Sequence, residues 1–122
     1  MGMIGFSKVN PRTIPWETND CVVRATSVAT GDSYELVHAL YKALGRRNGR
    51  GTPIFLINLV LDKAEKMQYD DRHTLNKFIA AHPKGTFVCC SRRHAFAVID
   101  GVVHDQGEVG GKTRVLWTWR IK

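Results

Sequence analysis

One cysteine, with a histidine and an aspartate later in the chain, sets the first functional hypothesis. Cys21 follows Asn19 and Asp20 and opens a run of apolar and small residues. An Asp or Asn before such a run favours a helix N-cap, because its oxygen accepts a free backbone N–H of the first turn. Backbone N–H groups and the helix dipole stabilise an anion there. The sequence therefore predicts that Cys21 begins a helix and is biased toward thiolate, its nucleophilic form.

His94 and Asp105 are the expected partners of this thiol. A cysteine nucleophile needs an imidazole to take or share its proton, and the imidazole needs an acceptor on its other nitrogen. The dipeptide Asp100-Gly101 between two apolar runs predicts a two-residue hairpin turn. Pairing the strands outward from that turn brings Asp105 close to His94. The predicted catalytic residues are thus Cys21, His94 and Asp105.

Strand alternation adds an expectation about the face on which the histidine lies. Successive side chains of a strand point to opposite faces, so His94 would share a face with Phe96 and Val98. A helix that carries Cys21 and packs against this face would meet His94.

The elements that must position these residues divide into helices first and strands last. Helices are expected at 21–30, from a capping signal at 32–35 to Gly45, from Thr52 to about Met67, and from Thr74 to Ala81. The second helix reads as amphipathic through Leu36, Val37, Leu40 and Leu44. The third is dense enough in apolar residues for most of its circumference to be buried.

Strands are expected at 86–90, 94–99, 102–104 and 115–121. Residues 1–15, which contain Pro11 and Pro15, are expected to be an extended lead-in. Helices followed by an antiparallel sheet predict an α+β fold class. The 122 residues are enough for a single domain, 1–122, with a hydrophobic core.

The net charge and the number of cysteines limit the kinds of partner and the classes of protein that the sequence allows. The net charge is +7, which permits an anionic partner such as nucleic acid or an acidic protein. The basic segment 45–51 is expected to be a flexible, solvated loop rather than a nucleic-acid site. Three cysteines do not form a disulfide scaffold. No export signal and no run of about 18 apolar residues is visible, so a cytoplasmic protein without a membrane span is expected.

A cysteine at a helix start, a histidine opening a strand and an aspartate on the next strand, in the run from His94 to Asp105, resemble the papain-like cysteine peptidase superfamily. The closer likeness is to its small bacterial and phage branches, similar to the CHAP-type amidases and bacteriocin-processing peptidases. The resemblance implies a papain-like fold in which N-terminal helices pack on a C-terminal antiparallel sheet. It implies that Cys21 is the nucleophile, His94 the general base and Asp105 its orienter.

The same resemblance implies a thiol hydrolase without a cofactor or a metal. The implied substrate is a peptide, protein or peptidoglycan, cleaved at a peptide, isopeptide or peptidoglycan-type amide bond through an acyl-thioenzyme. A phage-encoded member would act in the host cell or from a virion.

The residues before Cys21 depart from the family pattern. Papain-like enzymes commonly supply an oxyanion donor from a Gln several residues before the cysteine, and the segment 15–18 contains none. The side chain of Asn19, together with the backbone N–H of Cys21, is the expected replacement. Trp16 is expected to line a substrate groove.

Several alternatives stay open or are disfavoured. Cys21 could be a small buried hydrophobe. A zinc site built from Cys89, Cys90, His94 and His104 is disfavoured, because adjacent cysteines on a strand point to opposite faces. The remaining histidines, His38, His73 and His82, are expected at helix surfaces or helix ends.

The alternative function is a catalytically inactive papain-like or other α+β binding module. Such a module would use its basic surface to hold nucleic acid or a host protein. The sequence leaves the oligomeric state open.

Overall fold

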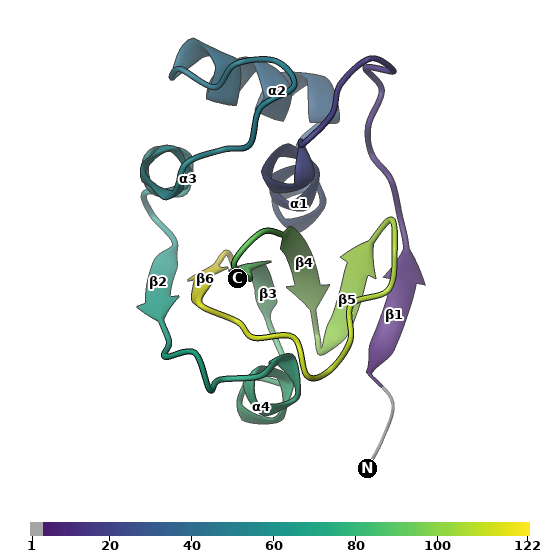
Figure 1. Ribbon diagram of the computed structural model, residues 1–122, viewed down its shortest axis with the longest axis vertical. Coiled ribbons are helices and arrows are strands. Elements are labelled where there is room, and N and C mark those ends of the chain that lie inside the picture. The colour runs from purple at the N-terminus through teal and green to yellow at the C-terminus, as the bar shows by residue number, and fades with distance from the viewer. Residues whose placement is uncertain (1–3) are drawn as a thin grey trace.

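Residues 4–122, the part of the chain that the computed structural model describes, form four helices and one six-stranded mixed sheet (Figure 1). The helices are α1 (Cys21–Thr30), α2 (Tyr34–Ala43), α3 (Ile54–Val60) and α4 (Leu75–Ala81). The strands are β1 (Gly5–Lys8), β2 (Glu65–Gln68), β3 (Thr86–Cys90), β4 (Ala95–Ile99), β5 (Val102–Asp105) and β6 (Trp117–Arg120). The predicted α+β class is confirmed.

The strand order is β1-β5-β4-β3-β6-β2, and β1 runs parallel to β5 while all other pairs are antiparallel. Ile99 pairs with Val102 around the Asp100-Gly101 turn, which confirms the predicted hairpin and its register. The extended lead-in contains a strand that was not predicted, since Gly5–Lys8 joins the edge of β5. The first three residues of that lead-in lie outside the described part of the chain.

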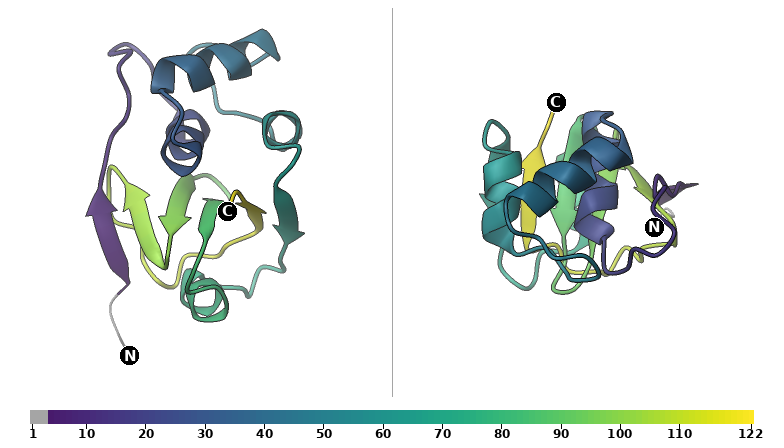
Figure 2. Two further views of the ribbon diagram at one scale, coloured as in Figure 1. Left: turned by 180° about the vertical axis from the view of Figure 1, so that it is seen from behind. Right: turned by 90° about the horizontal axis from the view of Figure 1, so that it is seen from above.

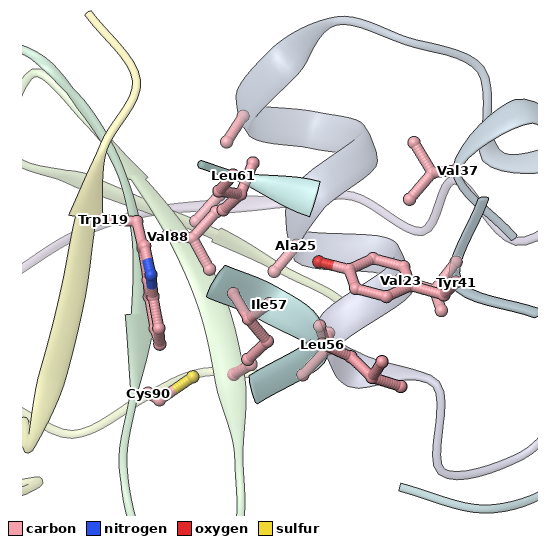
Figure 3. Packing of buried hydrophobic residues seen from close by; sticks show 14 of the residues in the cluster. Val23, Ala25, Val37, Tyr41, Leu56, Ile57, Leu61, Val88, Cys90 and Trp119 are labelled. Atoms are coloured by element: carbon pink, nitrogen blue, oxygen red, sulfur yellow. The ribbon is translucent and has the colours of Figure 1, made fainter. Parts of the chain in front are cut away.

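Two buried clusters cover the two faces of the sheet. One joins α1, α2 and α3 to Val88, Cys90 and Trp119 of the sheet (Figure 3). The other joins α4 to the opposite face, where Phe96 and Val98 lie. Figure 1 shows this division, with α4 on the far side of the sheet from the other helices.

The expected face for the cysteine helix is therefore wrong. Its buried residues pack with Ala95 and Ala97 of β4, whereas Phe96 and Val98 pack with α4. The reason is size: the small side chains of α1 and of Ala95 and Ala97 let helix and strand approach closely. His94 does not follow the alternation of side chains between the two faces of the sheet, because it precedes β4, which begins at Ala95.

The face of α2 that packs against the core is not the apolar face that the sequence predicted. Tyr34, Val37, His38 and Tyr41 are its buried residues, while Leu36, Leu40 and Leu44 are exposed by 49%, 43% and 43%. The buried tyrosines have polar partners for their hydroxyls; that of Tyr41 shares a 2.9 Å hydrogen bond with Thr26. The expectation that His38 lies on a helix surface is also wrong. Figure 2 shows α2 crossing above α1 and α3.

Helix α3 is shorter than predicted. It ends at Val60, and Met67 lies in β2, where it pairs with Thr118 of β6. Phe55 and Leu59 of α3 are 62% and 55% exposed, so its circumference is not mostly buried. Helix α4 begins as predicted, since the Thr74 side chain accepts the backbone N–H of Lys77 at 3.3 Å.

Candidate active site

Helix α1 begins at Cys21, as predicted, but its N-terminus is not capped by the Asp20 side chain. The Asp20 carboxylate instead accepts Arg12 in a two-pronged contact at 2.8 and 2.6 Å and the Tyr34 hydroxyl at 2.7 Å. Its backbone carbonyl serves the helix by accepting the N–H of Arg24 at 2.9 Å. No side chain among residues 4–122 caps this helix, so N–H groups of its first turn stay available beside the half-buried Cys21.

His94 is held by a short loop between β3 and β4. The Ser91 backbone N–H and hydroxyl both donate to the His94 carbonyl, at 2.8 and 3.2 Å. The imidazole lies 5.9 Å from the ring of Phe96, in a stacked arrangement. Because both ends of this loop are fixed by the pairing of Cys90 with Ala95, the ring has a defined place at the end of the sheet.

The His94 ring lies next to both of the other predicted residues. Nε2 donates to Asp105 Oδ2 at 2.5 Å. The Cys21 side chain interacts with the same ring, and both groups line one pocket. The structure thus brings Cys21, His94 and Asp105 together in the predicted order.

Asp105 is buried and fixed from several sides. Its backbone carbonyl accepts the N–H of Val9 at 2.8 Å, which ties the end of β5 to the segment after β1. Its carboxylate accepts the N–H of Gln106 at 2.8 Å and Arg24 Nη1 at 3.2 Å, in addition to His94. A carboxylate with these partners stays ionised and in place beside the imidazole.

The proton affinities of the three groups are mutually adjusted. The pKa of His94 is raised to about 9, chiefly by the hydrogen bond to Asp105 and then by the one to Cys21. Burial raises the pKa of the Cys21 thiol, but the hydrogen bonds from His94 and the Ala95 backbone outweigh it, so that the pKa falls below its ordinary value. The pKa of Asp105 is likewise lowered against its burial, by His94 and the Gln106 N–H. This arrangement favours the thiolate–imidazolium pair over the neutral thiol and imidazole.

Arg24 is a residue of the candidate site that was not predicted from the sequence. From within α1 its guanidinium reaches Asp20 Oδ1 at 3.1 Å and Asp105 Oδ1 at 3.2 Å, and its side chain is buried. It therefore connects the start of the cysteine helix to the acid that orients His94. The available signal was a lone charge in an otherwise apolar and small-residue helix, four residues after an aspartate.

A pocket of about 360 Å³ opens beside the thiol. One wall is the segment from Gly51 to Ile54 with Ile57 of α3, and the other is the β3–β4 loop, residues 91–94. Cys21 and His94 both line it. The pocket opens beside the sulfur, and Pro53, Ile54 and Ile57 make one side of it apolar.

The loop at residues 45–51, which leads into the pocket wall at Gly51, is held by the buried carboxylate of Glu17. Its Oε1 accepts the backbone N–H of Gly49 at 2.6 Å, and its Oε2 accepts Arg46 Nη1 at 3.0 Å and His38 Nε2 at 2.7 Å. Burial raises the pKa of Glu17, but Arg46, His38 and the backbone donors together lower it to about 2. The expectation of a flexible, solvated loop is wrong for Arg46, which is 3% exposed, because it neutralises this carboxylate.

The two weaker site predictions fall outside the pocket. Asn19, whose φ of 52° is left-handed, donates its side-chain N–H to the Gly49 carbonyl at 2.9 Å. Trp16 is 60% exposed and meets the His38 ring edge-on at a centroid distance of 6.2 Å. Neither residue lines the pocket that holds Cys21.

Of the other two cysteines, Cys90 lines the pocket beside Cys21 and Cys89 does not. Cys89 and Cys90 are free thiols buried in different clusters, as their adjacent places on one strand predict. Burial raises the pKa of both, so neither competes with Cys21 as a thiolate. Within residues 4–122, no three His, Cys, Asp or Glu side chains are grouped as metal ligands would be.

Comparison with protein-family models, with curated proteins and with solved structures finds no match. None of the described helices is long and apolar enough to cross a membrane.

Proposed function

We propose that this protein is a thiol hydrolase of papain-like architecture that cleaves an amide bond through Cys21, His94 and Asp105. One observation carries the proposal: a single imidazole is hydrogen-bonded on Nε2 to a buried carboxylate and lines one pocket with the thiol at the start of a helix. The opposed pKa shifts of Cys21 and His94 support the same roles. The substrate class is a peptide, isopeptide or peptidoglycan-type amide.

In the acylation step, the Cys21 thiolate attacks the carbonyl carbon and forms a C–S bond. The carbonyl oxygen becomes an oxyanion, and the N–H groups at the uncapped start of α1, with that of Cys21 itself, are suited to stabilise it. The imidazolium of His94 then donates its proton to the leaving nitrogen as the C–N bond breaks. An acyl-thioenzyme and a free amine result.

In the deacylation step, neutral His94 removes a proton from a water molecule, which attacks the thioester carbon. The C–S bond breaks, the carboxylic acid leaves, and the thiolate–imidazolium pair is restored. Asp105 stays ionised throughout, because Arg24 and the Gln106 N–H stabilise its charge, and it keeps the His94 ring in place.

This chemistry suits a cytoplasmic enzyme. If the gene is of phage origin, the cytoplasm is that of the host cell. All three cysteines are free thiols in the structure, and a reducing compartment keeps the Cys21 sulfur in its active state.

The proposal is tested with three substrate pools, of linear peptides, isopeptide-linked peptides and peptidoglycan fragments. Mass spectrometry should detect cut products in one pool with the wild-type protein and with Cys89→Ala, which removes a buried sulfur on the other side of the sheet. Cys21→Ala should abolish the cuts, and acid quenching of the wild-type reaction should trap an acyl group on Cys21.

Cuts that persist in Cys21→Ala, or the absence of Cys21-dependent cuts in all three pools, would contradict the proposal. Steeply salt-dependent binding of nucleic acid by a protein whose Cys21 is unreactive would support the binding module instead.

A further inference from the structure

Two arginines stand at the mouth of the pocket beside the thiol. Arg92 and Arg93 occupy the tip of the β3–β4 loop, both are exposed, and both line the same pocket as Cys21 and His94. They are two residues and one residue before the imidazole that the mechanism uses. A substrate that reaches the sulfur must therefore pass close to two guanidinium groups.

These arginines lack carboxylate partners of their own. The ion pairs within residues 4–122 engage Arg12, Arg24 and Arg46, and none engages Arg92 or Arg93. No Asp or Glu lines this part of the described surface, where the other lining residues are apolar or uncharged apart from the catalytic pair. The pocket thus presents uncompensated positive charge.

The loop that carries the arginines is not free to move them far from the site. Its two ends are joined by the pairing of Cys90 with Ala95, and Ser91 makes two hydrogen bonds to the His94 carbonyl. The backbone at Arg92 and Arg93 is therefore tied to the backbone of the catalytic histidine. Planar guanidinium groups held near one point are suited to bind a carboxylate through paired N–H donors.

We infer that the site selects substrates that carry a carboxylate group close to the scissile amide, with Arg92 and Arg93 as the specificity-determining residues. The inference rests on the proposed function, since it assigns a substrate class to that same thiol. The carboxylate has two chemical sources, an acidic side chain or a free C-terminus, which the experiment separates.

The charge selectivity is measured with two small alkylating agents, anionic iodoacetate and neutral iodoacetamide. Relative to free cysteine, the ratio of the iodoacetate rate to the iodoacetamide rate at Cys21 should rise on the order of tenfold at low salt, because a positive cleft concentrates anions. The ratio should fall as ionic strength rises. In Arg92→Gln/Arg93→Gln it should fall toward the ratio of free cysteine.

Arg72→Gln/Arg114→Gln is the matched control, since it removes the same net charge from two exposed arginines that do not line the pocket. This variant should keep the wild-type ratio. If both double variants change the ratio equally, or if neither does, the inference is overturned even though the iodoacetamide rate still reports a reactive Cys21. A slow iodoacetamide reaction in every protein would instead count against the proposed function.

The source of the carboxylate is resolved with three peptide pools. One has acidic side chains and amidated C-termini, one has neutral side chains and free C-termini, and one is neutral with amidated ends. Faster cutting of the first pool identifies an acidic side chain, and faster cutting of the second identifies a terminal carboxylate. Equal cutting of all three pools, or a preference that survives Arg92→Gln/Arg93→Gln, would overturn the inference.

Discussion

At the scale of single residues, His94 is the group that couples the acid to the thiol. Its ring is only half-buried, yet its pKa is raised to about 9, and the hydrogen bond to Asp105 is the largest cause. The imidazole is thus largely protonated at neutral pH. Its charge in turn lowers the pKa of Cys21, so the reactivity of the sulfur depends on a carboxylate that it does not touch.

Replacement of Asp105 by Asn should lower the pKa of His94 from about 9 toward the ordinary value near 6.5, because the largest stabiliser of the imidazolium is lost. An NMR titration of the His94 ring measures this directly. Asp62→Asn, which removes an exposed carboxylate outside the pocket, is the control. A His94 pKa that stays near 9 in Asp105→Asn would show that the carboxylate does not control it.

The three central residues were predictable because local signals place them. A helix-start pattern indicated the position of Cys21, and the Asp100-Gly101 turn set the register that brings Asp105 near His94. The partners of Arg24 and Glu17 were not predictable in the same way. Arg24 meets Asp105 across 81 positions of the chain, and no local pattern encodes a contact chosen by the tertiary fold.

At the scale of elements, the C-terminal end of α1 and the start of α2 were predicted better than the sheet edges. Gly31 ends α1 with a φ of 80°, and Ser33 caps α2 through the Leu36 N–H at 3.1 Å, both as their residue types indicate. Strand β2 was missed because all four of its residues are exposed, so it has no apolar alternation. Strand β1 was missed because a short parallel edge strand is defined by its distant partner.

The buried carboxylate of Glu17 should fix the loop at residues 45–51, which leads into the pocket wall at Gly51. Glu17→Gln leaves Arg46 without its buried ion-pair partner and weakens the hydrogen bond from Gly49. We expect the free energy of unfolding in urea to fall by about 3 kcal/mol, as for other broken buried pairs. Trypsin should also cut the native protein faster after Arg47 or Arg50, because the loop opens more often.

Glu35→Gln is the control for this prediction, since Glu35 is an exposed carboxylate on α2. Its effect on stability should be within about 0.5 kcal/mol. If Glu17→Gln behaves like Glu35→Gln in both urea and trypsin, the loop at residues 45–51 does not depend on the buried carboxylate.

At the scale of the whole molecule, buried carboxylates make folding depend on acid. The pKa values of Glu17, Asp20 and Asp105 are all lower in the folded protein than their ordinary values, because cationic and N–H partners outweigh burial. A group with a lowered folded pKa stabilises the fold above its unfolded pKa, and this contribution is lost as pH falls toward the folded value. The protein should therefore lose stability from about pH 4.5 downward.

Urea unfolding between pH 6 and pH 2.5 tests this expectation. Glu17 alone, whose pKa moves from 4.5 to about 2, should account for a loss on the order of 3 kcal/mol over the range. The acid slope should be shallower in Glu17→Gln, because that titrating group is gone. A stability that is flat down to pH 3 would contradict the role of these carboxylates.

The pH dependence of Cys21 alkylation by iodoacetamide, followed by mass spectrometry in the wild-type protein and in His94→Ala, tests the central claim most directly. We predict a wild-type midpoint below the ordinary thiol pKa of about 8.5, and a shift upward in His94→Ala as the imidazolium is lost. Cys89 and Cys90, which are buried, should stay unlabelled in both proteins. A wild-type midpoint at or above 8.5, or one that His94→Ala leaves unchanged, would contradict the claim that His94 activates Cys21 as a nucleophile.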